Sequence, residues 1–305
     1  MFEKIDLHMH TTVSDGTDTP AEILSRVRDA GLELFAVTDH DAVKSCEIIQ
    51  KLRTETDPVF LTGVEFSCRD DEGKYHILGY GYDPASEPIR RIVETGHRFR
   101  VKKTRSRLDF LRTTCGFCFP EEEIQALFAL DNPGRPHIGN LMVKYGYAET
   151  KEEAIKKYIN QIHFQNEYVS PGEAIESIIT GGGIPVLAHP IYGSGDQLIL
   201  GEEMERRLRR LKDYGLRGVE AFYPSFTAKM ICQMLELAER YDLYVTAGSD
   251  YHGTNKSVKP GDTGLEKVAV YPEGLKKFLS AATRCPQPSE TGSKNADFRI
   301  LKMER

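Results

Sequence analysis

The amino-acid sequence predicts an α/β barrel with a helical insertion, and three observations support this fold class. A pattern of amphipathic helix, glycine and short apolar strand recurs along the 305-residue chain. The predicted strands end in histidine, aspartate or glutamate, while their interiors stay apolar. Between residues 83 and 166 the pattern is interrupted, and only helices are predicted there. Alternation of helices and strands is typical of a parallel sheet.

The unit that begins at Asp18-Thr19-Pro20 shows the repeated pattern. These residues are typical of a helix start, and Ala30-Gly31 is typical of a helix end. An apolar strand at 34–37 follows and ends in Thr38-Asp39-His40. Similar units return at 170–189, at about 202–222 and at about 227–252. Seven strands are predicted, centred near Ile5, Ala36, Leu61, Ile77, Val186, Val219 and Val245.

Seven such units favour a barrel over an open, doubly wound sheet. No GxGxxG motif follows the first strand, which argues against a dinucleotide-binding domain. We therefore predict a discontinuous catalytic barrel from residues 1–82 and 167–285.

The interrupted stretch, residues 83–166, is predicted to be a helical insertion that caps the substrate. Helices are expected at 88–112, 121–130, 136–145 and 151–160. The first of them is rich in arginine and lysine, which we interpret as a solvated helix face. Residues 286–305, rich in Ser, Pro, Gly and Lys, are predicted to form a loosely ordered C-terminal tail. The basic residues of the first helix are Arg90, Arg91, Arg98, Arg100, Lys102, Lys103, Arg105 and Arg107.

Composition excludes several classes of function. The net charge of −6 disfavours extensive binding of duplex nucleic acid, although a few local cations suffice for a small phosphorylated ligand. No apolar run approaches the roughly 18–20 residues that span a membrane, and no apolar leader is seen. We therefore expect a cytoplasmic protein. The six cysteines are scattered, and we expect reduced thiols, some of them buried.

The candidate functional residues lie at the polar ends of the predicted strands. His8 and His10 are two residues apart, so a strand places both imidazoles on one face. In a β/α barrel the carboxyl ends of the strands meet at one face, where residues distant in sequence converge. The set contains six of the nine histidines. Its members are His8, His10, Asp15, His40, Glu65, His76, His189, Asp250 and His252.

Taken alone, His8 and His10 fit a surface strand with two satisfied histidines equally well. The whole set argues otherwise, because so many imidazoles and carboxylates in one pocket are costly without cations. Imidazole and carboxylate ligands suit Zn²⁺, Mn²⁺ and Fe²⁺, and the set lacks the cysteines of a closed structural zinc site. Nine candidate ligands exceed the needs of one ion. The residues therefore predict two or three divalent ions with a bridging carboxylate.

Five motifs resemble those of the PHP family, named for polymerase and histidinol phosphatase. They are His8-Met9-His10, Thr38-Asp39-His40, Gly63-Val64-Glu65, His189-Pro190 and Ser249-Asp250-Tyr251-His252. The resemblance implies a distorted (β/α)₇ TIM-like barrel that holds a trinuclear metal centre. It assigns His8, His10, Glu65 and Asp250 to one ion, His76 and His189 with shared Glu65 to a second, and Asp15, His40 and His252 to a third.

Asp15 stands where some members of this family have histidine. The third site would therefore be richer in oxygen, which makes Mn²⁺ or Fe²⁺ as suitable there as Zn²⁺. Asp39 precedes the ligand His40, and we expect it to orient a ligand without binding metal itself.

The insertion resembles one branch of the family, the small phosphoesterases that act on nucleotides or sugar phosphates. Arg135-Pro136-His137 matches the branch's RPH motif, which implies that Arg135 and His137 bind substrate phosphate. Arginine offers a planar fork to phosphate oxygens, and a helix N-terminus adds backbone donors. The alternative is that Arg135 pairs locally and His137 lies on the surface. Relatives often read S-H-T where this chain has Ser225-Phe226-Thr227, so its choice of substrate is expected to differ.

These residues predict a metal-dependent phosphoesterase in which a metal-bound hydroxide attacks phosphorus in line. The resemblance favours a nucleoside 3′,5′-bisphosphate or a cyclic ribose phosphate as the substrate. Histidinol phosphate and the 5′ ends of short RNA are alternatives. Two rival functions are a C–N hydrolase of the amidohydrolase type and a non-catalytic regulatory PHP module. The general acid is left unassigned.

Overall fold

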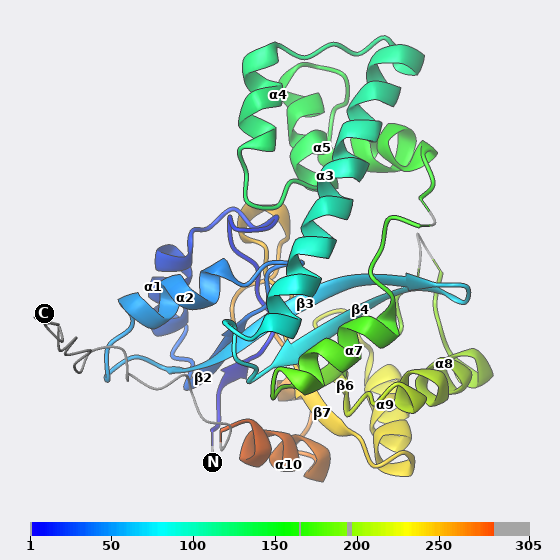
Figure 1. The fold of residues 1–305 in the computed structure, drawn as a ribbon. Coiled ribbons are helices and arrows are strands. Elements are labelled where there is room, and N and C mark those ends of the chain that lie inside the picture. The colour runs from blue at the N-terminus through cyan, green and yellow to red at the C-terminus, as the bar shows by residue number, and fades with distance from the viewer. Residues whose placement is uncertain (1, 165, 194–196, 284–305) are drawn as a thin grey trace, which may run out of the picture.

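A seven-stranded sheet forms the centre of the molecule in a computed structural model that describes residues 2–164, 166–193 and 197–283 (Figure 1). The spatial order of the strands follows the chain from β1 to β7. All seven predicted strands are confirmed. They are β1 (Ile5–Asp6), β2 (Leu34–Val37), β3 (Val59–Asp70), β4 (Gly73–Tyr80), β5 (Ile184–Leu187), β6 (Gly218–Phe222) and β7 (Tyr244–Ala247).

The sheet curls until its first and last strands approach each other. The Leu7 amide donates to the Ala247 carbonyl at 3.0 Å, and the Asp250 amide donates to the His8 carbonyl at 2.7 Å. Met9 and Tyr251 form a parallel bridge one step further along. These contacts nearly close a barrel, so the predicted fold class is confirmed. They also bring the segments after β1 and β7, which carry predicted ligands, side by side.

One strand runs against the others, so the expectation of a wholly parallel sheet is wrong at β4. β4 pairs antiparallel with both β3 and β5. Only Asp71 and Glu72 join β3 to β4, and a parallel connection needs a dozen or more residues. A hairpin is therefore the only possible link. Because β4 is reversed, His76 near its start lies at the same end of the barrel as the carboxyl ends of the parallel strands.

Helices packed around the barrel bury its outer face. Their bounds are set by local sequence: Thr19 and Glu22 form a capping box at the start of α1, and Ser170 and Glu173 do the same for α7. Each helix turns an apolar stripe to the sheet, as Ile23 does in α1. These helices are α1 (Pro20–Asp29), α2 (Lys44–Leu52), α7 (Pro171–Thr180), α8 (Gly201–Asp213), α9 (Ala228–Arg240) and α10 (Glu273–Ala282).

The stretch between β4 and α7 is helical, as predicted. α4 and α5 stand beside the outer half of the long helix α3, away from the barrel (Figure 1). They share an apolar cluster of their own that includes Leu111, Ile138 and Met142. The exact division into domains remains a prediction. The elements are α3 (Glu87–Cys115), α4 (Glu121–Phe128), α5 (Arg135–Lys144), α6 (Lys151–Glu153), a π-helical turn (Ala154–Tyr158) and a 3₁₀ turn (Ile159–Gln161).

Two other sequence predictions can be compared with the structure. Within the described ranges, no helix is long and apolar enough to cross a membrane. The five cysteines in these ranges are free thiols, and Cys46 and Cys68 are buried. The predicted tail at 286–305 lies outside the described residues.

Candidate metal centre and substrate pocket

All nine predicted ligands meet at one end of the barrel. Most of them lie in a strand or a few residues beyond one, and Asp15 lies in the turn that follows the segment after β1. Sites at this end are typical of barrels built from β/α units. His8, His10 and Asp15 follow β1, His40 follows β2, Glu65 lies in β3, His76 in β4, His189 follows β5, and Asp250 and His252 follow β7.

Glu65 lies at the centre of this group and is buried. One of its oxygens faces three imidazoles and the other faces two. Such a carboxylate is placed to bridge two ions. The distances are 3.4 Å from Oε2 to His8 Nε2, 3.1 Å to His10 Nε2 and 3.0 Å to His40 Nδ1, and 2.7 Å from Oε1 to His76 Nδ1 and 3.1 Å to His189 Nε2.

Two aspartates complete the group on either side of Glu65. Asp250 Oδ1 lies 3.5 Å from His8 Nε2 and 3.4 Å from His10 Nε2. Asp15 Oδ1 lies 3.2 Å from His252 Nε2, and Asp15 Oδ2 lies 3.9 Å from His40 Nε2. The nine residues thus form one continuous layer of nitrogen and oxygen atoms.

The donor atoms fit divalent metal ions. Within the described chain, the buried nitrogens His8 Nε2, His10 Nε2 and His40 Nδ1 have no hydrogen-bond partner. A buried polar atom without a partner is costly, and metal coordination would remove that cost. Three sets of ligand atoms lie within 4.8 Å of one another. The sets are His10, Asp15, His40 and His252; His8, His10 and Glu65; and His40, Glu65 and His76.

The pKa values of two buried carboxyl groups also favour metal binding. Burial by itself would raise the pKa of Glu65, but the His40 and His76 imidazoles outweigh it and hold that pKa well below its usual value. Asp15 is likewise buried, and the pKa of its carboxyl is held low by His40 and His252. Both carboxylates therefore stay charged and available as ligands.

Hydrogen bonds behind the imidazoles fix which nitrogen faces the centre. His8 Nδ1 donates to Glu220 Oε1 at 3.0 Å, and His252 Nδ1 donates to the Asp250 carbonyl at 2.8 Å. In both rings the proton sits on the outer nitrogen, which leaves the Nε2 lone pair for a metal. Glu220 Oε2 also accepts from the His189 amide at 2.7 Å, so this one carboxylate positions two predicted ligands.

Glu220 was missed by the sequence prediction, although a signal was present. It is the one charged residue of the otherwise apolar stretch Gly218–Phe222, and it is fully buried. A buried carboxylate in a strand interior needs specific partners. Its hydrogen-bond partners, however, are His189 and His8, which lie 31 and 212 positions away in the sequence.

Asp39, predicted to orient a ligand without binding metal itself, contacts the loop after β1. Its carboxylate accepts from the Thr11 amide and from Ser14 Oγ, both at 2.7 Å. His10 Nδ1 in turn donates to Ser14 Oγ at 3.3 Å. Asp39 therefore holds the loop after β1 and, through Ser14, the ring of His10.

Tyr223, on the segment that follows β6, contacts a predicted ligand. Its hydroxyl donates to Asp250 Oδ2 at 2.8 Å, and Lys256 Nζ lies 2.5 Å from the same oxygen. Because both donors contact Oδ2, Asp250 Oδ1 remains available to bind a metal ion. Phe226, which stands in place of the histidine of relatives, is buried against Tyr192 and Tyr223.

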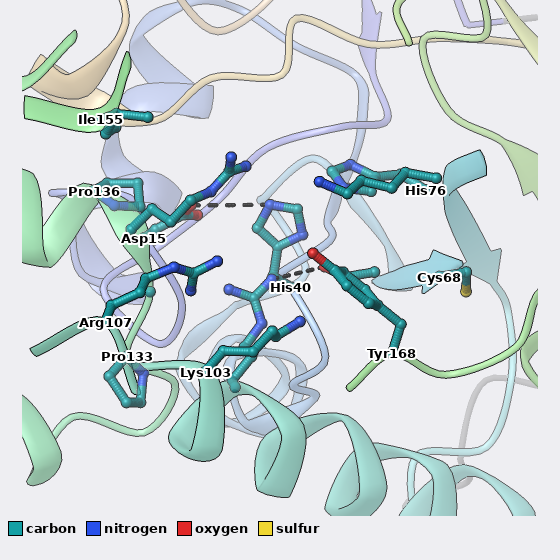
Figure 2. A pocket seen from close by; sticks show the side chains of 15 residues that line it. Asp15, His40, Cys68, His76, Lys103, Arg107, Pro133, Pro136, Ile155 and Tyr168 are labelled. Carbon is teal, nitrogen blue, oxygen red and sulfur yellow. Dashed lines mark hydrogen bonds and ion pairs between the residues drawn. The ribbon is translucent and has the colours of Figure 1, made fainter. Parts of the chain in front are cut away.

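A cavity adjoins the predicted ligands on the side of the insertion. Figure 2 shows Lys103 and Arg107 reaching from α3 toward the space beside His40 and Asp15. The interpretation of the basic run on α3 as a solvated face is therefore wrong for three of its members, which share one helix face at 100, 103 and 107. The cations that line the cavity are Lys74, Arg100, Lys103, Arg107 and Arg135.

Most of these cations lack an anionic partner. Arg100 pairs with Asp41 at 2.6 Å, but no carboxylate of the described residues pairs with Lys103, Arg107 or Arg135. Lys103 Nζ lies 3.6 Å from the centroid of the Tyr168 ring, and Arg107 Nε is buried without a partner. Burial and the neighbouring Arg100 lower the pKa of Lys103 to about 7. This excess of positive charge favours an anionic ligand.

The two residues of the RPH motif differ in position. Arg135 opens α5, lines the cavity and donates to Asn160 Oδ1 at 3.1 Å. His137 Nδ1 accepts from the Gly134 amide at 3.0 Å, so it caps the helix, and it is not among the residues that line the cavity. The phosphate-binding role of both residues stays a prediction.

The chain is similar in sequence to several known proteins. Residues 6–170 match the model of the PHP domain. The chain is 29% identical over 258 residues to a phosphoribosyl 1,2-cyclic phosphate 1,2-diphosphodiesterase of Eggerthella lenta. The aligned region covers 81% of this chain and 94% of that protein. It is 28% identical over 270 residues to a 3′,5′-nucleoside bisphosphate phosphatase of Chromobacterium violaceum, with 86% and 90% covered. It is 27% identical over 255 residues to a 5′-3′ exoribonuclease of Haemophilus influenzae, with 83% and 91% covered.

Solved structures extend the likeness to the fold. A predicted metal-dependent phosphoesterase of Bifidobacterium adolescentis superposes with a TM-score of 0.76 at 26% identity, over 91% of this chain and 96% of that one. A protein of Chromobacterium violaceum described as an amidohydrolase, with bound sulfate and no metal, superposes with a TM-score of 0.75 at 25% identity, over 84% and 90%.

Proposed function

The chain belongs to the PHP family of metal-dependent phosphoesterases, and from that premise we propose that its substrate is a small phosphate ester with a second anionic group. The observation that carries this proposal is the cavity of unpaired cations directly beside the predicted metal ligands. One phosphate would sit on the metal side, near His40 and His76. The second anionic group would then lie against Lys103, Arg107 and Arg135.

The nine converging residues are proposed to hold two or three divalent ions. Glu65 would be shared between two of them, because its oxygens face different imidazoles. The assignment by groups is the one that the family resemblance implies: His8, His10, Glu65 and Asp250 for one ion; Glu65, His76 and His189 for another; Asp15, His40 and His252 for a third. The donors are nitrogen and oxygen only, which suits Mn²⁺, Fe²⁺ or Zn²⁺.

When bound, such ions supply charge neutralisation at the phosphate oxygens and a lowered pKa for water. Residues of the chain would bind the phosphate oxygens and position the other groups. Arg135 offers two parallel N–H donors to phosphate oxygens. Tyr168 lies under the Lys103 ammonium and keeps it facing the cavity. Asp39 and Glu220 would hold imidazoles of the predicted ligands in the orientation that metal binding requires.

Two substrates fit these requirements best, a nucleoside 3′,5′-bisphosphate and a cyclic ribose phosphate. The bisphosphate carries a phosphate besides the one attacked, as the cavity requires, and a cyclic ribose phosphate does so when another of its hydroxyls is phosphorylated. The relatives named for these activities each cover most of the chain. The exoribonuclease relatives favour a third candidate, the 5′-phosphorylated end of a short RNA.

Hydrolysis of a panel of substrates tests the proposal, measured as inorganic phosphate from the monoesters, as ring-opened ester or phosphate from the cyclic phosphate, and as mononucleotide from the RNA. The panel holds adenosine 3′,5′-bisphosphate, AMP, ribose cyclic phosphate, histidinol phosphate and short 5′-phosphorylated RNA, each with Mn²⁺. We expect release from a substrate with two phosphate groups, loss of activity with a chelator, and loss in His8→Ala. Release from AMP and histidinol phosphate at the same rate would contradict the role of the cation cavity.

A further inference from the structure

The outer half of the helical insertion has an apolar core of its own. Its cluster, which includes Leu111, Ile138 and Met142, is separate from the two apolar clusters of the barrel. Among the described residues, none from α4, α5 or α6 belongs to the barrel clusters. Parts of a chain that share no apolar core can move relative to each other unless specific contacts prevent it. The position of α5, and with it Arg135, therefore depends on the polar contacts between insertion and barrel.

Two polar contacts of the insertion lead to the backbone of predicted metal ligands. Asn132, between α4 and α5, is fully buried, and its Nδ2 donates to the His40 carbonyl. Lys151, at the start of α6, donates from Nζ to the Asn255 carbonyl at 2.7 Å and to Asn255 Oδ1 at 3.2 Å. Asn255 Nδ2 donates in turn to the Asp15 carbonyl at 2.8 Å. The insertion thus reaches one ligand directly and a second through one intervening side chain.

Lys151 is enclosed between α5 and a turn of the barrel. Asn255 ends this turn, a 3₁₀ turn (Gly253–Asn255) after β7, and its amide donates to the His252 carbonyl at 3.3 Å. The Lys151 side chain is only 16% exposed. It also packs against α5, where a Cβ at Gly139 would come within 3.0 Å of Lys151 Cγ. A shift of α5 would therefore be felt at Lys151 and, through it, at the turn that follows His252.

The ligands that these contacts reach belong to one set. The donor atoms of His10, Asp15, His40 and His252 all lie within 4.8 Å of one another. The Asn132 and Asn255 hydrogen bonds act on the backbone carbonyls of three of these four residues. Metal affinity depends on groups behind the ligands that hold them in place. A movement of the insertion that displaces these carbonyls would therefore change how well the set binds a metal ion.

We infer that the insertion positions this ligand set through Asn132 and through the Lys151–Asn255 contact, so that docking of the insertion and binding of a metal ion by the set favour each other. The inference rests on the proposed function, because it requires these ligands to bind metal. Such coupling is reciprocal: the factor by which docking raises metal affinity is the factor by which the metal ion stabilises docking. Asn132, Lys151 and Asn255 are positioning residues, since they act through the ligands.

Binding of Mn²⁺ without substrate tests the inference from the side of the metal. Equilibrium dialysis measures the number of bound ions and the affinity of each in the wild type, Lys151→Met, Asn255→Ala and Lys151→Arg. We expect Lys151→Met and Asn255→Ala to weaken the binding of one ion about fivefold or more and to leave the other ions unchanged. Lys151→Arg keeps N–H donors at this position and should recover most of the lost affinity.

Hydrogen exchange tests the inference from the side of the insertion. Mn²⁺ should slow exchange of the α5 backbone amides in the wild type, and Lys151→Met should lose most of this slowing. A lysine that merely stabilised the insertion would, when replaced, speed exchange equally with and without Mn²⁺ and leave Mn²⁺ affinity unchanged. Lys157→Met is the matched control: Lys157 is also in the insertion, but its side chain is 60% exposed and pairs with Glu153 at 3.4 Å. This variant should match the wild type in both measurements.

Neither measurement needs turnover, so this inference and the proposed function can fail separately. Wild-type affinity for every ion in both Lys151→Met and Asn255→Ala, or equal weakening of all the ions, would overturn the coupling, whatever the panel of substrates shows. If no substrate in the panel is hydrolysed but Mn²⁺ binding and α5 exchange respond as expected, the coupling stands and the proposed function fails. A wild type that binds no Mn²⁺ would overturn both.

Discussion

Asp41 and Arg100 join the helical insertion to the barrel. Arg100 Nε, on α3, donates to Asp41 Oδ2 at 2.6 Å, and Asp41 Oδ1 accepts from the Ser67 amide of β3 at 2.9 Å. Asp41 follows His40 directly and has a left-handed backbone, with φ of 48°. One carboxylate thus positions a cation of the pocket, the loop that carries a predicted ligand, and the strand that carries Glu65.

Asp41→Ala should lower the free energy of unfolding by about 3 kcal/mol, because it leaves the Arg100 charge buried without a partner. Urea denaturation followed by circular dichroism measures this. Asp242→Ala is the matched control: Asp242 has φ of 47° and pairs with Lys277 at 3.4 Å, but its side chain is exposed. That change should cost about 1 kcal/mol or less beyond the backbone effect. Equal losses in the two variants would show that burial of the pair contributes nothing.

Glu220→Gln should weaken metal binding about 10- to 100-fold, because the Gln amide cannot accept from both His8 Nδ1 and the His189 amide. Metal content after dialysis, and activity as a function of Mn²⁺ concentration, measure the effect. We expect excess Mn²⁺ to restore most of kcat. Glu236→Gln, on α9 and away from the centre, should bind metal as the wild type does. Wild-type metal affinity in Glu220→Gln would refute the positioning role.

Lys103 should make substrate affinity depend on pH. Its pKa of about 7 in the free protein means that the ammonium loses its proton as the pH rises through 7, instead of near 10.5. The second anionic group of the substrate then loses one cation, so KM should rise between about pH 7 and 9 while kcat changes little. Lys103→Arg stays charged over this range and should show a flatter KM profile. Parallel profiles in the two proteins would exclude Lys103 as the source.

Two substitutions of His137 distinguish a helix-capping role from a phosphate-binding role. His137→Ala removes the acceptor for the Gly134 amide and should cost about 1 kcal/mol of stability. His137→Gln restores a capping residue that suits this position, so its thermal midpoint should return to the wild-type value. If His137 also binds phosphate, both variants should lose about tenfold or more in kcat/KM. Wild-type kinetics in His137→Gln would limit the residue to its capping role.

Much of the fold could be predicted from the sequence because its signals are local. Caps such as Thr19 with Glu22, and apolar runs such as 34–37, act over a few residues, so all seven strands and the helical insertion were predicted from the chain alone. The nine candidate ligands could be named from the sequence for the same reason. They form short motifs at strand ends, and the barrel topology then requires those ends to meet.

What only the tertiary structure decided depends on contacts between distant residues. The direction of β4 came from a link of two residues whose geometry the strand pattern does not encode. Arg100, Lys103 and Arg107 look like a solvated face until α3 is placed against Asp41 and Tyr168. Glu220 looks like an isolated charge until β6 lies beside His8 and His189. Local propensity determines where elements begin and end, whereas burial and charge pairing depend on which elements the fold brings together.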